Sequence, residues 1–470
     1  MATTMQPASA PASSREVGGY DWYVVAILFS VSVLGYIDRV ILSFLVEAIK
    51  GDLALNDAEI GAVTGMAFAV LYVFGGVFIG RMLDKGRRVT ILAACILVWS
   101  IATAASGFAT GFVTLFLARM FVGVGEAGLN PAAIGIISSR FPQDKVQKPI
   151  GLFTTGLYVG GGMAMMLGAH LLGKFSAGGP YDLPLIDTAE PWRVVFLLLA
   201  VPGLLVALLV QTTVRDHSAA QRAAAAPAKG EALAFARENR TLITLLALGI
   251  VSWSMNNYGL LNWYPAMLMR SYAMTPALVA TSYGPAFLLA GIAGCLAVHP
   301  YHAWLRKRFG GKAAYWLTFT SMAVLSVTTI LGPIVPTVGL AVFMSYANLF
   351  VSSMSVASIF VLIVAVVPPT LRGLYTGLYM ALVNLTGGAF GSVLVGLMTD
   401  HVYGAKGLNL ALTTMAVVFG PLGAGLMYAA LKRAPERGDS AYEAFGPLIV
   451  VQHVAINLPA LGVIYKPRLT

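Results

Sequence analysis

Four charged residues lie deep inside long apolar stretches of this chain, namely Asp38, Arg39, Arg119 and Glu126. An unpaired charge at the centre of a membrane-spanning helix costs roughly 2.5–3.5 kcal/mol. Four of them would cost on the order of 10 kcal/mol, which is comparable to the net stability of a whole protein. We therefore expect these residues to be paired, hydrated or both.

The spacing of the four charges limits how they can meet. Arg119 and Glu126 are seven residues apart, which is two turns and roughly 10 Å along one face of a helix. Asp38 and Arg39 are adjacent, so their side chains point about 100° apart on a helix. One of them can face a cavity while the other reaches a neighbouring helix.

Two interpretations of this cluster remain open. In the first, the charges form a structural lock between two helices. In the second, a carboxylate takes up a proton, its pairing with an arginine weakens, and the arginine becomes available to an anionic substrate. Ionisable groups inside membrane helices are functional sites by default, so we adopt the second interpretation. The two are compatible, because a gate that opens during transport is also structural.

The second half of the chain has polar but uncharged side chains at comparable positions. The candidates for the lining of a polar cavity are Tyr36 of the first half and, in the second half, Asn256, Asn257, Tyr258, Asn348 and Asn384. Such groups orient a polar ligand, but they do not carry a proton at neutral pH. Coupling chemistry is therefore expected in the first half, and hydrogen bonding between helices is the alternative role of each asparagine.

The composition indicates which elements position these residues. Of the 470 residues, 58% are hydrophobic and 11% are charged, whereas a soluble protein has about 25% charged residues. Apolar runs long enough to cross a bilayer recur twelve times, and each must be helical because lipid offers the backbone no hydrogen-bond partner. The predicted spans are 22–48, 58–80, 89–108, 111–138, 149–174, 192–213, 241–268, 276–299, 313–333, 337–367, 372–399 and 408–431. Asn130-Pro131 is expected to kink the fourth span just after Glu126.

The positive charges fall into alternate loops. With both termini in the cytosol, 23 of the 30 Lys and Arg residues lie on the cytosolic side, five lie on the outer side, and the other two are Arg39 and Arg119. This asymmetry predicts cytosolic termini. The same distribution argues against a basic face for nucleic acid.

The chain divides at its longest polar stretch. We expect a disordered cytosolic arm over 1–20, a six-helix bundle over 21–213, a cytosolic linker over 214–240, a second six-helix bundle over 241–432 and a tail over 433–470. Similar segments open spans five and eleven, GLFTTGLY and GLYTGLY. Two similar halves are typical of parallel-repeat transporters, whose substrate site lies between them. The tail is expected to be interfacial, and a thirteenth span is the alternative.

Several motifs together resemble a known family. The motif GYIDR lies at 35–39, and Arg119 is followed by GVGEA at 123–127 and by Phe141-Pro142. This combination resembles the spinster family of sphingolipid and lysophospholipid transporters within the major facilitator superfamily. Sugar-acid symporters of the anion:cation family share the Tyr-x-Asp-Arg and Gly-x-Gly-Glu-Ala elements.

The resemblance implies a role for each buried charge. Asp38 and Glu126 would respond to protons, and Arg39 and Arg119 would be the structural and head-group-facing cations. The substrate would be an amphiphile with an anionic or zwitterionic head, such as a lysophospholipid or sphingosine phosphate, moved by alternating access. The alternative is a proton symporter of small organic anions.

A basic loop between spans two and three resembles the cytosolic signature of the same superfamily, with one residue missing between Lys85 and Gly86. The resemblance implies a gating loop in which Asp84 pairs with the second half. Its candidate residues are Gly80, Asp84, Lys85, Arg87 and Arg88. If there is no gate, the basic residues still serve membrane topology.

Other function classes are disfavoured by missing motifs. The sequence has no Gly-x-Ser-x-Gly, His-Glu-x-x-His or Walker loop, which are signatures of common enzyme classes. We expect a protein that is not an enzyme and uses no cofactor or metal. Its partners would be a small-molecule or lipid substrate, protons and membrane lipid. We expect it to act as a monomer in a bacterial inner membrane.

Overall fold

The computed structural model describes residues 17–84, 86–142, 145–176, 181–183, 186–215, 230–368 and 370–434. The described chain is almost entirely helical, which confirms the all-α fold class. Most of the predicted arm, the predicted linker and the predicted tail lies outside the described residues.

The helices of the first half follow the predicted spans. The second span combines α2, the π-helical segment η1 and α3, and the fourth combines α5 and α6, which are interrupted at Gly128 near the predicted kink. The elements are α1 (Gly19–Leu53), α2 (Asp57–Gly61), η1 (Ala62–Met66), α3 (Ala67–Asp84), α4 (Arg88–Gly107), α5 (Phe112–Ala127), α6 (Leu129–Arg140), α7 (Gln147–Ser176) and α8 (Pro191–Thr213).

The second half has the same pattern. The eleventh span of the chain combines α14, the π-helical η5, α15 and the π-helical η6. The elements are α10 (Arg240–Tyr272), α11 (Pro276–Phe309), η3 (Gly310–Lys312), α12 (Ala313–Leu331), η4 (Gly332–Ile334), α13 (Val338–Val366), α14 (Arg372–Val383), η5 (Asn384–Gly391), α15 (Ser392–Met398), η6 (Thr399–Tyr403), η7 (Ala405–Gly407) and α16 (Leu408–Arg433).

Ten segments of the described chain are long and apolar enough to cross a membrane. One of them, Pro276–Ile334, contains the two helices α11 and α12. The helix α10 is not among the ten, because Asn256 and Asn257 lower the hydropathy of its centre, but its 33 residues exceed the length that a crossing needs. With α10 included and α11 and α12 counted separately, the described chain has the twelve spanning helices that the sequence predicts.

Two small features were not predicted. Strands β1 (Tyr181–Leu183) and β2 (Ile186–Ala189) form an antiparallel hairpin between α7 and α8. A short helix, α9 (Glu231–Glu238), lies within the stretch that the sequence suggests is only a linker. It is held to α14 by an edge-on contact between Phe235 and Tyr375, with ring centres 5.5 Å apart.

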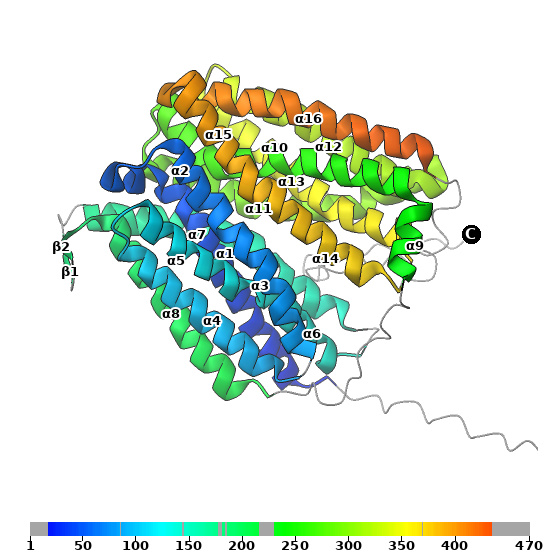
Figure 1. The fold of residues 1–470 in the computed structure, drawn as a ribbon, viewed down its shortest axis with the longest axis horizontal. Coiled ribbons are helices and arrows are strands. Elements are labelled where there is room, and N and C mark those ends of the chain that lie inside the picture. Colours follow the sequence, from blue (N-terminus) through cyan, green and yellow to red (C-terminus); the bar gives the residue numbers. More distant parts are fainter. Residues whose placement is uncertain are drawn as a thin grey trace, which may run out of the picture.

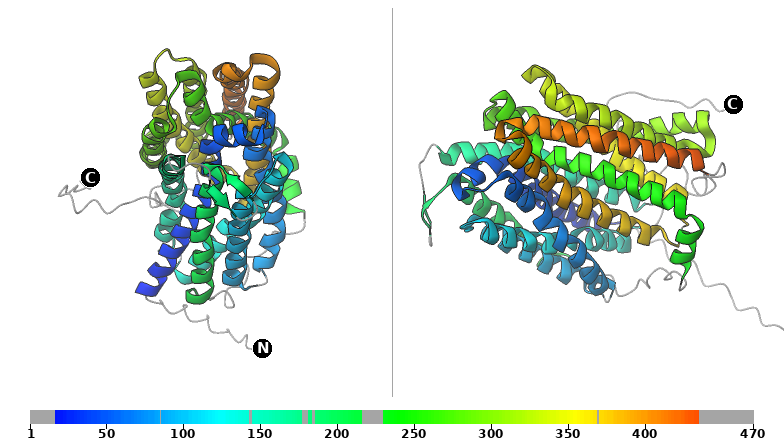
Figure 2. Two further views of the ribbon diagram at one scale, coloured as in Figure 1. Left: turned by 90° about the vertical axis from the view of Figure 1, so that its left-hand side faces the viewer. Right: turned by 45° about the horizontal axis from the view of Figure 1, so that its top comes forward.

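The two halves form two bundles that lie side by side (Figures 1 and 2). The helix α1 begins and α16 ends at one end of these bundles, which we call the terminal end, and the β1–β2 hairpin lies at the opposite end, which we call the hairpin end (Figure 1). A Cβ atom on Gly123 of α5 would overlap the Phe68 carbonyl of α3. This close approach places the charged face of α5 directly against α3.

Candidate functional site

Arg39 of α1 and Glu126 of α5 form an ion pair. The Arg39 Nη2 donates to Glu126 Oε2 at 2.7 Å, and Nε donates to the same oxygen at 3.3 Å. The Glu126 side chain is 2% exposed, whereas that of Arg39 is 23% exposed. Within the described part of the chain, Glu126 Oε1 is buried and has no hydrogen-bond partner. Arg39 is thus the more accessible member of the pair.

Three aromatic rings surround the Arg39 guanidinium. Its central carbon lies 4.2 Å from the ring centre of Phe68, 5.0 Å from that of Tyr36 and 5.4 Å from that of Tyr72. Such contacts stabilise a cation in an apolar setting. Phe68 and Tyr72 were missed by sequence reasoning, because an aromatic pair four residues apart in an apolar helix has no distinguishing pattern.

Asp38 and Arg119 form the buried side of the cluster. The Asp38 carboxylate accepts a hydrogen bond from the Thr103 hydroxyl of α4 at 3.2 Å, and its backbone carbonyl accepts one from Arg119 Nη2 at 3.1 Å. Both side chains are almost fully buried. Asp38 thus points to α4 while Arg39 points to α3 and α5, in agreement with the predicted divergence of adjacent helical residues.

The Arg119 guanidinium has spare hydrogen-bonding capacity. Its Nε and Nη1 atoms are buried and have no hydrogen-bond partner among the residues that the structure places. An unsatisfied buried donor is costly, and more so when it is charged. Together with the free Glu126 Oε1, these atoms are the points at which the cluster can accept another polar group.

Three asparagines of the second half are hydrogen-bonded within that half. Asn256 Nδ2 donates to the Thr329 hydroxyl of α12 at 3.0 Å, and Asn257 Oδ1 accepts from the Ser352 hydroxyl of α13 at 2.6 Å. Asn384 Nδ2 donates to the Met380 carbonyl at 2.8 Å, one turn earlier in its own span. Asn256 and Asn257 therefore form hydrogen bonds between helices, which is the alternative role that the sequence suggests for each asparagine.

Tyr258 is the residue of the second half that approaches the charged cluster. It lies within electrostatic range of Arg39 and of the Tyr36 and Tyr72 hydroxyls. The predicted residue Asn348 is buried, and its Nδ2 has no partner in the described structure. Tyr258 is thus a residue of the second half that is near enough to the cluster to affect its electrostatics.

A second charged network joins the halves at the hairpin end. Arg270 of α10 donates to Asp57 of α2 through Nη1 at 2.7 Å and Nη2 at 2.9 Å, and to Glu47 of α1 through Nε at 2.8 Å. Lys50 of α1 also binds Asp57. Lys50 and Arg270 are two of the five basic residues that the sequence places on the outer side. The pairing of Arg270 was not predicted, because Asp57 is 213 residues away in the chain.

The same network caps the helix α2 from the opposite half. The carboxylate of Asp400 in η6 accepts hydrogen bonds from the backbone N–H groups of Asp57 at 3.0 Å and Ala58 at 2.7 Å. These are the first two residues of α2, where free N–H groups favour a negative charge. The hairpin end is therefore closed by charge-assisted contacts between the halves.

The predicted gating loop is only partly visible. Gly80 lies in α3, Arg88 begins α4, and Arg88 Nη1 donates to the Gly135 carbonyl of α6 at 3.1 Å. Arg87 is exposed. Lys85 and the side chain of Asp84 lie outside the described residues, so pairing of Asp84 with the second half stays a prediction.

Comparison with known proteins identifies related transporters. The Major Facilitator Superfamily model matches residues 28–392. The chain is 28% identical over 411 residues to an MFS-type efflux pump of Mycolicibacterium smegmatis, covering 86% of this chain and 91% of the pump. It is 26% identical over 257 residues to the hexuronate transporter of Bacillus subtilis, covering 52% of this chain and 56% of that protein.

Two further matches concern spinster proteins. The chain is 26% identical over 305 residues to protein spinster of Drosophila melanogaster, covering 61% of this chain and 47% of spinster. It therefore spans about half the length of the hexuronate transporter and of spinster. A bacterial homologue of the human lysosomal transporter spinster, solved in an inward-facing and unoccupied conformation, has a TM-score of 0.77 and 24% identity, covering 89% of this chain and 98% of that one.

These findings confirm the resemblance that the motifs indicate. The structural likeness establishes the fold, and the match to the superfamily model covers most of the chain. Twelve apolar helices in two bundles and a charged cluster inside the first bundle agree with this assignment. The chain belongs to the major facilitator superfamily and is a multi-pass membrane transporter.

Proposed function

We propose that this protein is a proton-coupled secondary transporter of an amphiphile with an anionic or zwitterionic head, such as a lysophospholipid or sphingosine phosphate. It acts by alternating access, as a monomer, in a bacterial inner membrane. The observation that carries the proposal is the Arg39 guanidinium, which is partly exposed, paired with the buried Glu126 and surrounded by aromatic rings.

Arg39 is suited to hold an anionic head group. A guanidinium binds the paired oxygens of a phosphate or carboxylate through a fixed fork of N–H donors. In the structure, Nε and Nη2 of that fork donate to Glu126. An incoming anion therefore competes with Glu126 for Arg39.

Protonation of Glu126 would shift this competition in favour of the substrate anion. The ionised carboxylate holds Arg39, and a protonated one loses most of that attraction. Arg39 then binds the substrate anion, and the proton travels with it. Asp38, which is buried beside Arg119 and Thr103, is a second carboxylate that takes part in proton transfer.

In alternating access, the charged network at the hairpin end would form when that end closes and break when it opens. If the termini are cytosolic, the hairpin end faces outward and the structure is closed on that side. Opening it requires that the contacts of Arg270 and Asp400 with α2 break. The solved bacterial spinster homologue is described as inward-facing, which agrees with closure at the hairpin end.

Proton symport of small organic anions is the second candidate. The match to the hexuronate transporter favours it, and Arg39 would bind a sugar-acid carboxylate as it binds a phosphate. The two candidates differ in the substrate, because a sugar acid has no long hydrocarbon chain.

Flux into proteoliposomes tests the proposal. A pH gradient would be imposed, and uptake of lysophospholipid, sphingosine phosphate and hexuronate would be measured for the wild type, Asp38→Asn and Glu126→Gln. Glu238→Gln, which neutralises an exposed carboxylate on α9, is the matched control. We expect gradient-driven lipid flux that the first two variants lose and the control keeps. Flux of hexuronate alone would support the second candidate. Lipid flux that is unchanged by the pH gradient and by both substitutions would refute proton coupling.

A further inference from the structure

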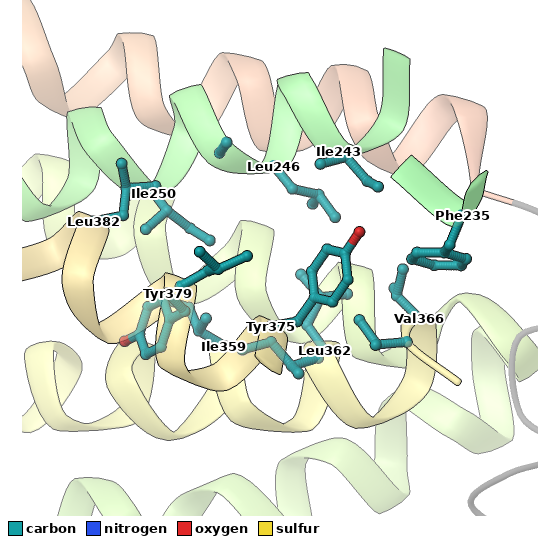
Figure 3. Close-up of a pocket in the computed structure, with 14 residues that line it drawn as sticks. Phe235, Ile243, Leu246, Ile250, Ile359, Leu362, Val366, Tyr375, Tyr379 and Leu382 are labelled. Carbon is teal, nitrogen blue, oxygen red and sulfur yellow. The ribbon is translucent and has the colours of Figure 1, made fainter. Parts of the chain in front are cut away.

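A cavity of about 210 Å³ lies inside the second half, between α10, α13 and α14 and beside α9 (Figure 3). We call it the apolar slot. From α10 it is lined by Ile243, Leu246, Ala247 and Ile250. These residues are spaced three, four and seven apart, so they form one face of the helix over two turns, or roughly 10 Å.

The other two helices line the apolar slot with the same spacing. The residues from α13 are Ile359, Leu362, Ile363 and Val366. Those from α14 are Tyr375, Leu378, Tyr379 and Leu382. Because the three faces have equal length, the apolar slot is elongated along the helices, and it is partly open at the surface, where Leu378 is 55% exposed.

The chemistry of the lining favours hydrocarbon over water. Protein interiors are normally packed without voids of this size, and an apolar cavity of about 150 Å³ is already large enough to stay dry and to take up benzene. A bound water needs two to four polar partners. Here the lining side chains offer two tyrosine hydroxyls, and that of Tyr375 lies 3.4 Å from the Ala232 carbonyl of α9.

The apolar slot leads towards the charged cluster. Figure 3 shows the Tyr379 hydroxyl directed away from Phe235, on the side of the slot where Ile250 and Leu382 lie. Tyr379 is within electrostatic range of Tyr258, which in turn is within range of Arg39. Tyr258 lies eight residues beyond Ile250 on α10, a rise of roughly 12 Å. The inner end of the apolar slot is thus the end that lies nearer to Tyr258 along α10.

We propose that the apolar slot receives the acyl chain of the amphiphile whose anionic head binds Arg39. This inference rests on the proposed lipid-transport function and adds the location of the chain. An extended acyl chain matches the elongated shape and the apolar lining. To occupy both sites, one molecule would extend its chain from Arg39 past Tyr258 into the inner end of the slot.

Filling the apolar slot tests the inference. Ala247→Phe places a ring inside it, and Leu248→Phe is the matched control, because the adjacent Leu248 is 48% exposed and faces outward. Uptake of palmitoyl and hexanoyl lysophosphatidylglycerol would be compared for each variant. Ala247→Phe should weaken the apparent affinity for the palmitoyl probe roughly tenfold, the effect of about 1.4 kcal/mol. The hexanoyl probe and the control variant should change little.

A cross-linking measurement on the wild type covers the case in which Ala247→Phe fails to fold. A lysophosphatidylglycerol with a photoreactive group near the end of its palmitoyl chain would be bound in nanodiscs and cross-linked. We expect labelled peptides from α10, α13 or α14. Labels confined to lipid-facing surfaces would overturn the inference.

The outcomes separate the two proposals. If the wild type moves neither probe and no sphingosine phosphate, the proposed function fails and this inference fails with it. If the wild type moves both probes but Ala247→Phe affects them equally, or affects neither, the apolar slot does not hold the chain and the proposed function is untouched.

Discussion

Arg270 of the second half and Asp57 of the first half are joined by two parallel hydrogen bonds of 2.7 and 2.9 Å. The Asp57 side chain is almost fully buried and that of Arg270 is nearly so. A two-point contact of this kind fixes orientation as well as distance. Because the two residues come from α2 and α10, the pair fixes the hairpin ends of the two bundles relative to each other.

Breaking this pair should open the hairpin end. We expect Arg270→Gln to shift the protein towards the state that is open at that end, because a coupling of 1–3 kcal/mol is enough to change a two-state population substantially. Spin labels on the exposed residues Thr110 and Lys406, one in each half, would report a longer distance. Arg433→Gln, which removes an exposed charge at the terminal end, should leave the distance unchanged. An unaltered distance in Arg270→Gln would mean that the pair does not hold the halves together.

A glycine contact at the same interface makes an independent prediction. A Cβ atom on Gly65 of η1 would collide with the Gly388 carbonyl of η5 in the opposite half. Gly65→Ala should therefore disfavour closure of the hairpin end and slow transport without abolishing folding. The same spin-label distance would lengthen, and Gly425→Ala on α16, where a Cβ meets nothing, is the control. A wild-type distance and rate in Gly65→Ala would contradict tight packing between the halves.

The spanning helices could be predicted because the bilayer imposes a simple rule on the sequence. Twenty apolar residues in a row have few alternatives to a helix in lipid, and even α10 with Asn256 and Asn257 at its centre follows that rule. The hairpin β1–β2 is held by its own strand pairing and the helix α9 by contacts with the distant α14, and neither lies in a long apolar run to which this rule applies. These elements were missed.

The charged cluster was predictable for a related reason. Asp38, Arg39, Arg119 and Glu126 stand out because charges are expensive in an apolar helix. Their partners do not stand out. Phe68, which packs on Arg39, looks like any apolar residue. The same holds for the network at the hairpin end, because Asp57 and Asp400 lie at span ends, where charges are ordinary. Only the folded chain brings them together, since Asp57 and Asp400 are 343 residues apart.

The geometry of Arg39 predicts that a positive charge alone at this position is insufficient for full substrate affinity. Lysine carries the same charge but lacks the planar fork and stacks less well on aromatic rings. Arg39→Lys should therefore weaken the apparent substrate affinity roughly tenfold, the effect of about 1.4 kcal/mol, and Arg39→Ala should abolish uptake. Initial rates against substrate concentration in proteoliposomes measure both. Equal affinities of the wild type and the Arg39→Lys variant, at matched expression, would show that the fork does not contact the substrate.

The last prediction concerns pH. If a proton on Glu126 frees Arg39, lowering the pH should tighten substrate binding in the wild type, because the neutral carboxyl competes less for the guanidinium. Glu126→Gln imitates the protonated form, so it should bind substrate at high pH as tightly as the wild type does at low pH, with little dependence on pH.

Binding would be measured by isothermal titration calorimetry across the pH range in detergent, where no gradient acts. Glu238→Gln should keep the wild-type profile, which separates the loss of this carboxylate from a general change in charge. A Glu126→Gln protein that binds more weakly than the wild type at every pH would instead assign Glu126 to the structural support of Arg39, and the proton would then have to act through Asp38.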